Sequence, residues 1–140
     1  MKNIAKQAVV LGCFFVMAAV VCNAQTVGLR VDIPFNFNVA EKVLPAGQYL
    51  ILAPQGQTLR ILGPNGAAAL TMTNPTGGRR PEGLGAVAFN CYGHRCFLSK
   101  FWTARTETGQ EIARCRLEKE LANEKDQLAV ITLKATPYQP

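Results

Sequence analysis

The sequence predicts a mainly β fold, an antiparallel β-sandwich or flattened barrel of about eight strands with one α-helix in the C-terminal region. Three observations predict it. Residues 29–39 alternate between apolar and polar side chains, which is the period of a half-buried strand. Similar short runs follow between turns that contain Gly and Pro, and two of them flank a two-residue loop. Connections this short join antiparallel neighbours, because parallel strands need a longer crossover.

The N-terminal 24 residues have the pattern of a signal peptide. Lys2 and Lys6 precede an apolar run from Ala8 to Val21, which is shorter than the roughly 20 residues that cross a bilayer. Small residues stand at positions 22 and 24, so we expect cleavage after Ala24 and a single β domain from residue 25 to residue 140. An uncleaved membrane anchor and a lipoprotein are the alternatives. The prediction places the mature protein in the periplasm or outside the cell, with no membrane span after cleavage.

The charge of the predicted mature domain is mildly positive. Of the 15 Lys and Arg residues, two lie in the predicted signal peptide, which leaves 13 bases against 9 acids and a net charge of +4. The bases are scattered and do not alternate with aromatic side chains along any run. We therefore expect no nucleic-acid partner; the charge favours solubility and weak attraction to anionic surfaces.

The opening stretch, residues 29–49, contains two strands and a corner. A first alternation ends at Pro34, and a second one places Phe35 and Phe37 on the same face. A Leu-Pro-Ala-Gly corner then suits a tight turn before the next strand, because Pro fixes φ and Gly tolerates positive φ. We expect the aromatic side chains to form the inner face of the sheet.

Three further strands, joined by short turns, are predicted at residues 48–53, 57–62 and 67–73. The last is rich in alanine, which disfavours sheets, so its neighbours rather than its own propensity assign it as a strand. Together they predict an antiparallel meander. Residues 74–83 hold two prolines, three glycines and the pair Arg79-Arg80, so we expect an exposed irregular loop there.

Residues 84–92 and 95–102 predict a hairpin around the loop Gly93-His94, with glycine where a type II′ turn needs it. Pairing outward from this loop places Cys91 opposite Cys96 in a non-hydrogen-bonded pair, whose Cα separation suits a disulfide. Export to an oxidising compartment favours the bond. We therefore predict a Cys91–Cys96 disulfide.

Residues 111–125 are predicted to form the helix. Thr108 and Glu111 match a capping box, and the segment is rich in good helix formers. Its apolar stripe is thin, so we expect the helix on the surface, over one edge or mouth of the sheet. Residues 127–135 follow as a strand that is apolar on both faces, which predicts a central strand or one buried on two sides. Pro137 is expected to end the structure.

A family resemblance rests on two groups of motifs. The first is Val31-x-Ile33-Pro34-Phe35-x-Phe37-x-Val39 with Leu44-Pro45-Ala46-Gly47-x-Tyr49, and the second is Tyr92-Gly93-x-Arg95-x-Phe97-Leu98-Ser99 with Trp102. In these motifs the chain resembles a group of small exported proteins of unknown function that are common in acidobacteria. The likeness covers nearly the whole predicted mature chain. It implies an exported β domain and implies no ligand or catalytic residue.

Few residues are candidates for catalysis or metal binding. Cys91, His94 and Cys96 offer sulfur and imidazole ligands, but they would need a fourth ligand and a cysteine pair at this register bridges readily. His94 at a hairpin tip lacks the third residue that would hold it as a general base. The acids are single or alternate with bases, and Ser99 is the only serine in the chain. We therefore predict no enzymatic activity, no metal and no cofactor.

Cys115 is the remaining cysteine of the predicted mature domain. Burial as a small apolar side chain is the favoured interpretation, and a bridge to a second chain is the alternative. The sequence leaves the oligomeric state open.

Two functions of different classes are compatible with these patterns. The first hypothesis is a non-catalytic binding or structural module of the cell envelope, whose partner is an unknown envelope protein or polymer. Its predicted contact surface, chosen for expected exposure, is Arg79, Arg80, Tyr92, His94 and Arg95. The alternative is a lipocalin-like carrier of a small apolar ligand, with a cavity lined by Phe35, Phe37, Phe89 and Trp102. An enzyme ranks third, because it would need polar groups converging in a cleft.

Overall fold

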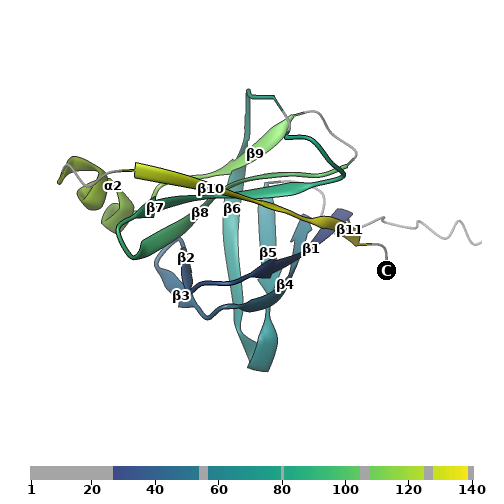
Figure 1. Cartoon of the computed structure of the whole chain (residues 1–140), viewed down its shortest axis with the longest axis horizontal. Coiled ribbons are helices and arrows are strands. Elements are labelled where there is room, and N and C mark those ends of the chain that lie inside the picture. The colour runs from purple at the N-terminus through teal and green to yellow at the C-terminus, as the bar shows by residue number, and fades with distance from the viewer. Residues whose placement is uncertain (1–26, 54–56, 80, 105–107, 125–127, 139–140) are drawn as a thin grey trace, which may run out of the picture.

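The structure is a computed structural model that describes residues 27–53, 57–79, 81–104, 108–124 and 128–138. The predicted signal peptide and its cleavage site lie outside these residues. The described chain is mainly β, as predicted, with eleven strands and one α-helix (Figure 1). The elements are β1 (Val27–Ile33), β2 (Phe37–Val39), β3 (Lys42–Leu44), β4 (Gly47–Ala53), β5 (Thr58–Leu62), the 3₁₀ turn η1 (Pro64–Gly66), β6 (Ala68–Thr76), β7 (Ala86–Tyr92), β8 (Arg95–Trp102), β9 (Gly109–Ile112), α2 (Arg116–Asn123), β10 (Leu128–Lys134) and β11 (Thr136–Tyr138).

The strands form two layers that share β6. One layer runs β11-β1-β4-β5-β6 and the other runs β6-β9-β8-β7-β10, because residues 68–72 of β6 pair with β5 and residues 73–76 pair with β9. In Figure 1, β7, β8 and β10 cross the molecule above β1 and β4. The predicted antiparallel meander is confirmed for β4, β5 and β6, and β1 joins it beside β4.

A single segment at the C-terminus links the two layers, as in a β-sandwich or a flattened barrel. β10 pairs with β7 and β11 pairs with β1, yet only Ala135 separates these two strands. The N–H of Ala135 donates to the carbonyl of Gly85 (3.0 Å), and the next residue, Thr136, pairs with Arg30. The backbones approach closely at this seam, because a Cβ at Gly85 would lie 2.6 Å from Cδ2 of Leu29.

Aromatic rings fill the interior beside aliphatic side chains from both layers. Phe37 lies edge-on to Tyr49 (5.0 Å between centroids) and to Phe89 (5.5 Å), and Phe35 is edge-on to Phe89 (5.1 Å). Such contacts stabilise a core beyond the burial of area. The predicted aromatic inner face is therefore confirmed, with Phe37 fully buried and Phe35 partly exposed.

The Leu-Pro-Ala-Gly corner is held by one buried tyrosine. The hydroxyl of Tyr49 donates to the carbonyl of Pro45 (2.5 Å), and the side-chain oxygen of Asn36 accepts from the N–H of Ala46 (3.0 Å). Burial raises the pKa of Tyr49 above its usual value. Gly63 packs against this ring, since a Cβ there would lie 2.2 Å from its Cε1. The corner thus sets the angle at which the chain enters β4.

The helix starts later than predicted, and the capping box is wrong. α2 begins at Arg116, with Cys115 at its N-cap position and no side-chain cap there. Residues 109–112 form β9 instead, paired with both β6 and β8. Gly109 packs against Trp102 and Ile112 is buried in the core, so tertiary burial overrides the helix propensity of this segment.

The other corrections concern strand ends and edges. β6 continues through Pro75 to Thr76, so the irregular loop is shorter than predicted. The predicted two-sided burial of residues 127–135 is wrong: among the described strands β10 borders β7 alone along its length, and Leu128 and Val130 are exposed. Pro137 does not end the structure, because it lies in β11 opposite Leu29. Its missing N–H is tolerated on such a short strand, which pairs on one side only.

Candidate functional site

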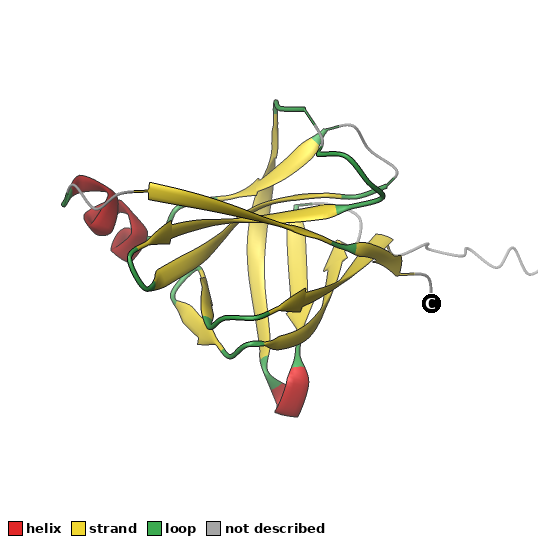
Figure 2. Ribbon diagram, in the orientation of Figure 1, coloured by secondary structure: helices red, strands yellow, loops and turns green. Residues whose placement is uncertain are grey.

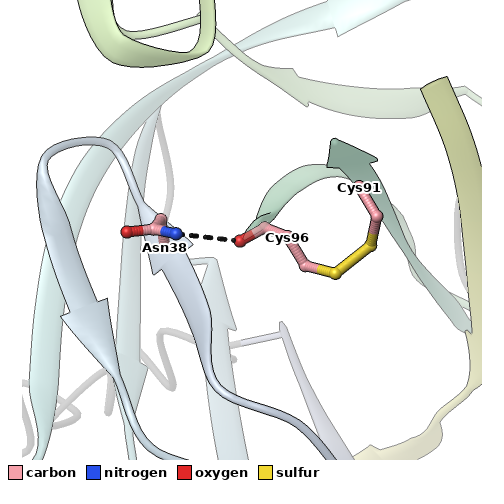
Figure 3. Close-up of a disulfide and its surroundings, with 3 residues drawn as sticks. All are labelled: Asn38, Cys91 and Cys96. Atoms are coloured by element: carbon pink, nitrogen blue, oxygen red, sulfur yellow. Dashed lines mark hydrogen bonds between the residues drawn. A yellow bond between two sulfur atoms is a disulfide. The ribbon is translucent and has the colours of Figure 1, made fainter. Parts of the chain in front are cut away.

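The β7–β8 hairpin carries the predicted disulfide. Cys91 and Cys96 are bonded, with Cα atoms 4.0 Å apart, and the pairing on both sides follows the predicted register. Gly93 at the loop has φ 60°, a conformation that glycine adopts without strain. Figure 3 shows the side chain of Asn38 donating to the carbonyl of Cys96 (3.2 Å), which ties the hairpin to β2. The sulfurs of Cys91 and Cys96 are bonded to each other. Within the described ranges, no group of three or more His, Cys, Asp or Glu residues could hold a metal ion.

The predicted contact surface does not form one patch. His94 and Arg95 are exposed at the hairpin tip, but Tyr92 is only 3% exposed, so its predicted place on the surface is wrong. Arg79 is exposed in the loop at the opposite end of β7, and Arg80 lies outside the described residues. The seven residues of β7 keep the two ends about 20 Å apart.

Tyr92 is buried because a carboxylate on α2 covers it. Glu118 is 4% exposed and accepts hydrogen bonds from the amide nitrogen of Asn90 (3.2 Å) and the hydroxyl of Tyr92 (3.3 Å). The guanidinium of Arg114 lies 3.8 Å from the same carboxylate. Burial, and then the charge of Glu118, raise the pKa of Tyr92. We call these four residues the Glu118 cluster.

The Glu118 cluster fixes the helix rather than forming a reactive site. Figure 2 shows α2 at one end of the molecule, next to the β7–β8 hairpin. Asn90 and Tyr92 face the carboxylate from the sheet, so its buried oxygen has hydrogen-bond partners. The sequence predicts instead a solvated face for the acids of this helix, which is wrong for Glu118. No local pattern distinguishes Glu118 from Glu120, which is exposed and pairs with Arg116.

The four residues of the predicted ligand cavity fall into two places. Phe35 and Phe37 each contact Phe89 at the main core. Trp102 belongs to a separate cluster with Ala86 and Ala88, on the opposite face of the sheet from the main core. The indole N–H of Trp102 is buried, and it has no hydrogen-bond partner among the described residues.

A groove of about 620 Å³ lies between the β2–β3 turn and strands β5 and β6. We call it the β3–β6 groove. It is lined by Val39, Ala40, Glu41, Lys42, Arg60, Leu62, Ala68, Ala69 and Leu70. In Figure 1, β3 lies on the side of β6 away from β5. The groove is thus bordered by the β2–β3 turn on one side and by β5 and β6 on the other.

The edge of β6 that faces the groove is unpaired. Gly63 donates to Ala67 and Thr73 donates to Gln57, so the odd-numbered residues of β6 bond to β5. The intervening residues Ala68, Leu70 and Met72 direct their N–H and C=O groups away from β5. Among the described strands, none pairs with β6 on this side before Thr73.

The opposite edge of the groove is also unpaired. Within the described chain β3 pairs only with β2. The two strands turn through the two-residue loop Ala40-Glu41, in which Ala40 has φ 52°. Val39 and Lys42 flank this loop and bond to each other, so Val43 directs its backbone groups away from β2.

Side chains around the groove combine exposed apolar groups with basic ones. Leu70 (68%), Met72 (65%) and Val43 (65%) are largely exposed along the two free edges. Lys42 and Arg60 stand against one acid, Glu41, and none of the three makes an ion pair within the described residues. The groove is therefore apolar with a positive bias. None of the sequence patterns predicted this groove; its one signal in the sequence is the run Ala67–Ala69, whose small side chains are unusual in a strand.

No protein-family model, curated protein or solved structure matches the chain. The resemblance to small exported acidobacterial-type proteins stays a prediction. No helix in the described ranges is long and apolar enough to cross a bilayer.

Proposed function

We propose that this protein is an exported, non-catalytic binding module of the cell envelope, and that it binds its partner in the β3–β6 groove. One observation carries the proposal: among the described strands, one edge of β6 has no partner beside an open groove, and the exposed side chain of Leu70 lies on that edge and lines the groove. Natural sheets usually cover, shorten or charge such edges, because unpaired backbone groups recruit other chains. An edge left open with leucine and methionine on it favours a binding role.

The predicted export supports the same role. A disulfide between Cys91 and Cys96 is typical of proteins that fold in an oxidising compartment. The predicted signal peptide leads to that compartment. The partner is then a component of the envelope or its surroundings.

The carrier hypothesis has less support than surface binding. It requires interior space between Phe35, Phe37 and Phe89, whereas the ring of Phe89 contacts both other rings. Trp102, the fourth predicted lining residue, lies in the other cluster. Binding at the β3–β6 groove needs no rearrangement of these side chains.

Position-specific photocrosslinking in living cells tests the proposal. A photoreactive amino acid at position 70 places the probe on the groove, and one at position 84 is the matched control, since Leu84 is 65% exposed elsewhere. We expect specific envelope adducts from position 70 that are absent from position 84. Equal adducts from both positions, or none from position 70 in exported protein, would contradict the proposal.

Intact mass under non-reducing conditions tests the export step. We expect a chain that begins at Gln25, contains one disulfide and keeps a single free thiol at Cys115. A chain that retains Met1 with every thiol reduced would contradict export.

A further inference from the structure

We infer that the β3–β6 groove accepts an extended peptide segment of a partner protein, which adds to the free edge of β6 as a β-strand. The inference rests on the proposed function and names the chemistry of the partner. Strand addition is a common mode of peptide recognition, in which main-chain hydrogen bonds supply affinity and alternate side chains supply specificity.

The backbone of β6 supplies the hydrogen bonds. Ala68, Leu70 and Met72 each present an N–H and a C=O to the groove, at the spacing of a sheet ladder. Val43 presents one further pair from β3. A segment lying in the groove would thus have the free backbone groups of β6 as its template.

Side chains around the groove select the segment. Its inward side chains would meet Val39 and Ala69, and the small Ala69 leaves room for apolar groups. Its outward side chains would lie beside Leu70 and within reach of Arg60 and Lys42, which favour a carboxylate. The predicted ligand alternates apolar residues with polar ones and carries at least one Asp or Glu on the polar side.

The shape of the groove favours a single segment over a second copy of this chain. β6 of another copy carries β5 along one edge, so a whole sheet would have to enter beside β3. The β2–β3 turn forms the second wall and limits the width of the opening. An isolated extended segment brings no second strand with it, so it needs only the strand spacing of about 4.8 Å from β6.

The test uses exported protein with the Cys91–Cys96 bond intact and a panel of nine-residue peptides. The peptides alternate valine with threonine, and glutamate replaces each threonine in turn. Amide hydrogen exchange reports on the site. We expect at least one glutamate-containing peptide to slow exchange at Leu70 and Met72 by roughly tenfold or more, without affecting Thr71. Failure of every peptide to protect these amides would overturn strand addition.

A backbone substitution separates strand addition from side-chain contact. Leu70→Pro removes an N–H that faces the groove and bonds to nothing in β5, so this edge tolerates it. Leu70→Val keeps the N–H and is the matched control. We expect Leu70→Pro to weaken peptide binding by roughly tenfold, and Leu70→Val to bind like the parent protein.

Methylated peptides keep the test independent of protein folding. N-methylation of the alternate peptide residues that face β6 removes their donors and leaves the protein unchanged. We expect binding to be lost, whereas methylation of the intervening residues that face Val43 has a smaller effect. Equal binding by both methylated forms would overturn the inference. Envelope crosslinks from position 70 that persist when all peptides fail would leave the binding site standing and reject the strand-addition mode alone.

Discussion

The two regions that flank the β2–β3 hairpin differ in how completely their polar groups are paired. On one side, β7 and β8 are joined by a disulfide, hydrogen-bonded to β2 and covered by α2 through Glu118. On the other side, no described strand pairs with the outward backbone groups of Ala68, Leu70 and Met72 in β6, which lie beside exposed apolar side chains. The pairing in the first region stabilises the fold. The open edge in the second region adds no stability, and we interpret it as a binding surface.

The largest expected loss of stability comes from the Glu118 cluster. Glu118→Ala leaves the amide of Asn90 and the hydroxyl of Tyr92 buried without their acceptor, so we expect a loss of about 2–3 kcal/mol in the free energy of unfolding. Urea denaturation measures it. Glu120→Ala is the matched control on the same helix; its surface ion pair with Arg116 is worth less than about 1 kcal/mol. Equal effects of the two substitutions would remove the distinction between the two glutamates.

Removal of the disulfide has the next largest effect. The double substitution Cys91→Ser and Cys96→Ser opens a short loop, which costs about 2 kcal/mol in the chain-entropy description. Thermal unfolding under non-reducing conditions measures it. Cys115→Ser is the control: we expect no loss of stability, because Ser at an N-cap accepts a backbone hydrogen bond.

Alkaline pH destabilises the region around β7, β8 and α2 through the ionisation of Tyr92. Its pKa is raised in the folded state, so above the ordinary value of 10.0 the unfolded chain loses the proton first. The contribution of Tyr92 to the free energy of unfolding is therefore fully present below pH 10, and it is lost as pH rises through the folded pKa. Tyr92→Phe should flatten this fall, and Tyr49, whose pKa is also raised, accounts for a remaining part. Unfolding free energies measured from pH 8 to pH 11 check the slope; an unchanged slope in Tyr92→Phe would contradict the assignment.

Substitutions in the groove have the smallest effect on stability. Val43→Thr and Leu70→Thr change exposed side chains, so we expect changes within about 0.5 kcal/mol. The same variants should reduce envelope crosslinking from a photoreactive residue at position 62, which lies on the groove wall. A large loss of stability would show that these side chains serve the fold instead of a partner.

Sequence patterns of a few residues predicted much of the β7–β8 hairpin and of the core beside it. The loop Gly93-His94 set the hairpin register, and that register placed Cys91 opposite Cys96. Alternation placed Phe37 in the core. These predictions succeeded because each depends on neighbours within about ten residues, where turn geometry and side-chain period act directly.

Features that depend on distant partners were missed. β9 forms where Gly109 meets Trp102, although the local sequence favours helix. β10 exposes Val130 because none of the described elements covers its outer face, which the strand's own apolar pattern does not reveal. The groove depends on one edge of β6 having no partner among the described strands, and the sequence of β6 itself has no local signal for that. Only the small side chains of the alanines at 67–69 indicated extra space beside β6.

Amide hydrogen exchange along β6 in the free, exported protein tests the central claim most directly. If this edge is open, Ala69 and Thr71, which bond to β5, exchange slowly, whereas Leu70 and Met72 exchange faster by roughly a hundredfold or more. We expect this alternation. Equal protection of Leu70 and Thr71 in the free protein would show that the edge is already covered, and it would contradict the binding groove.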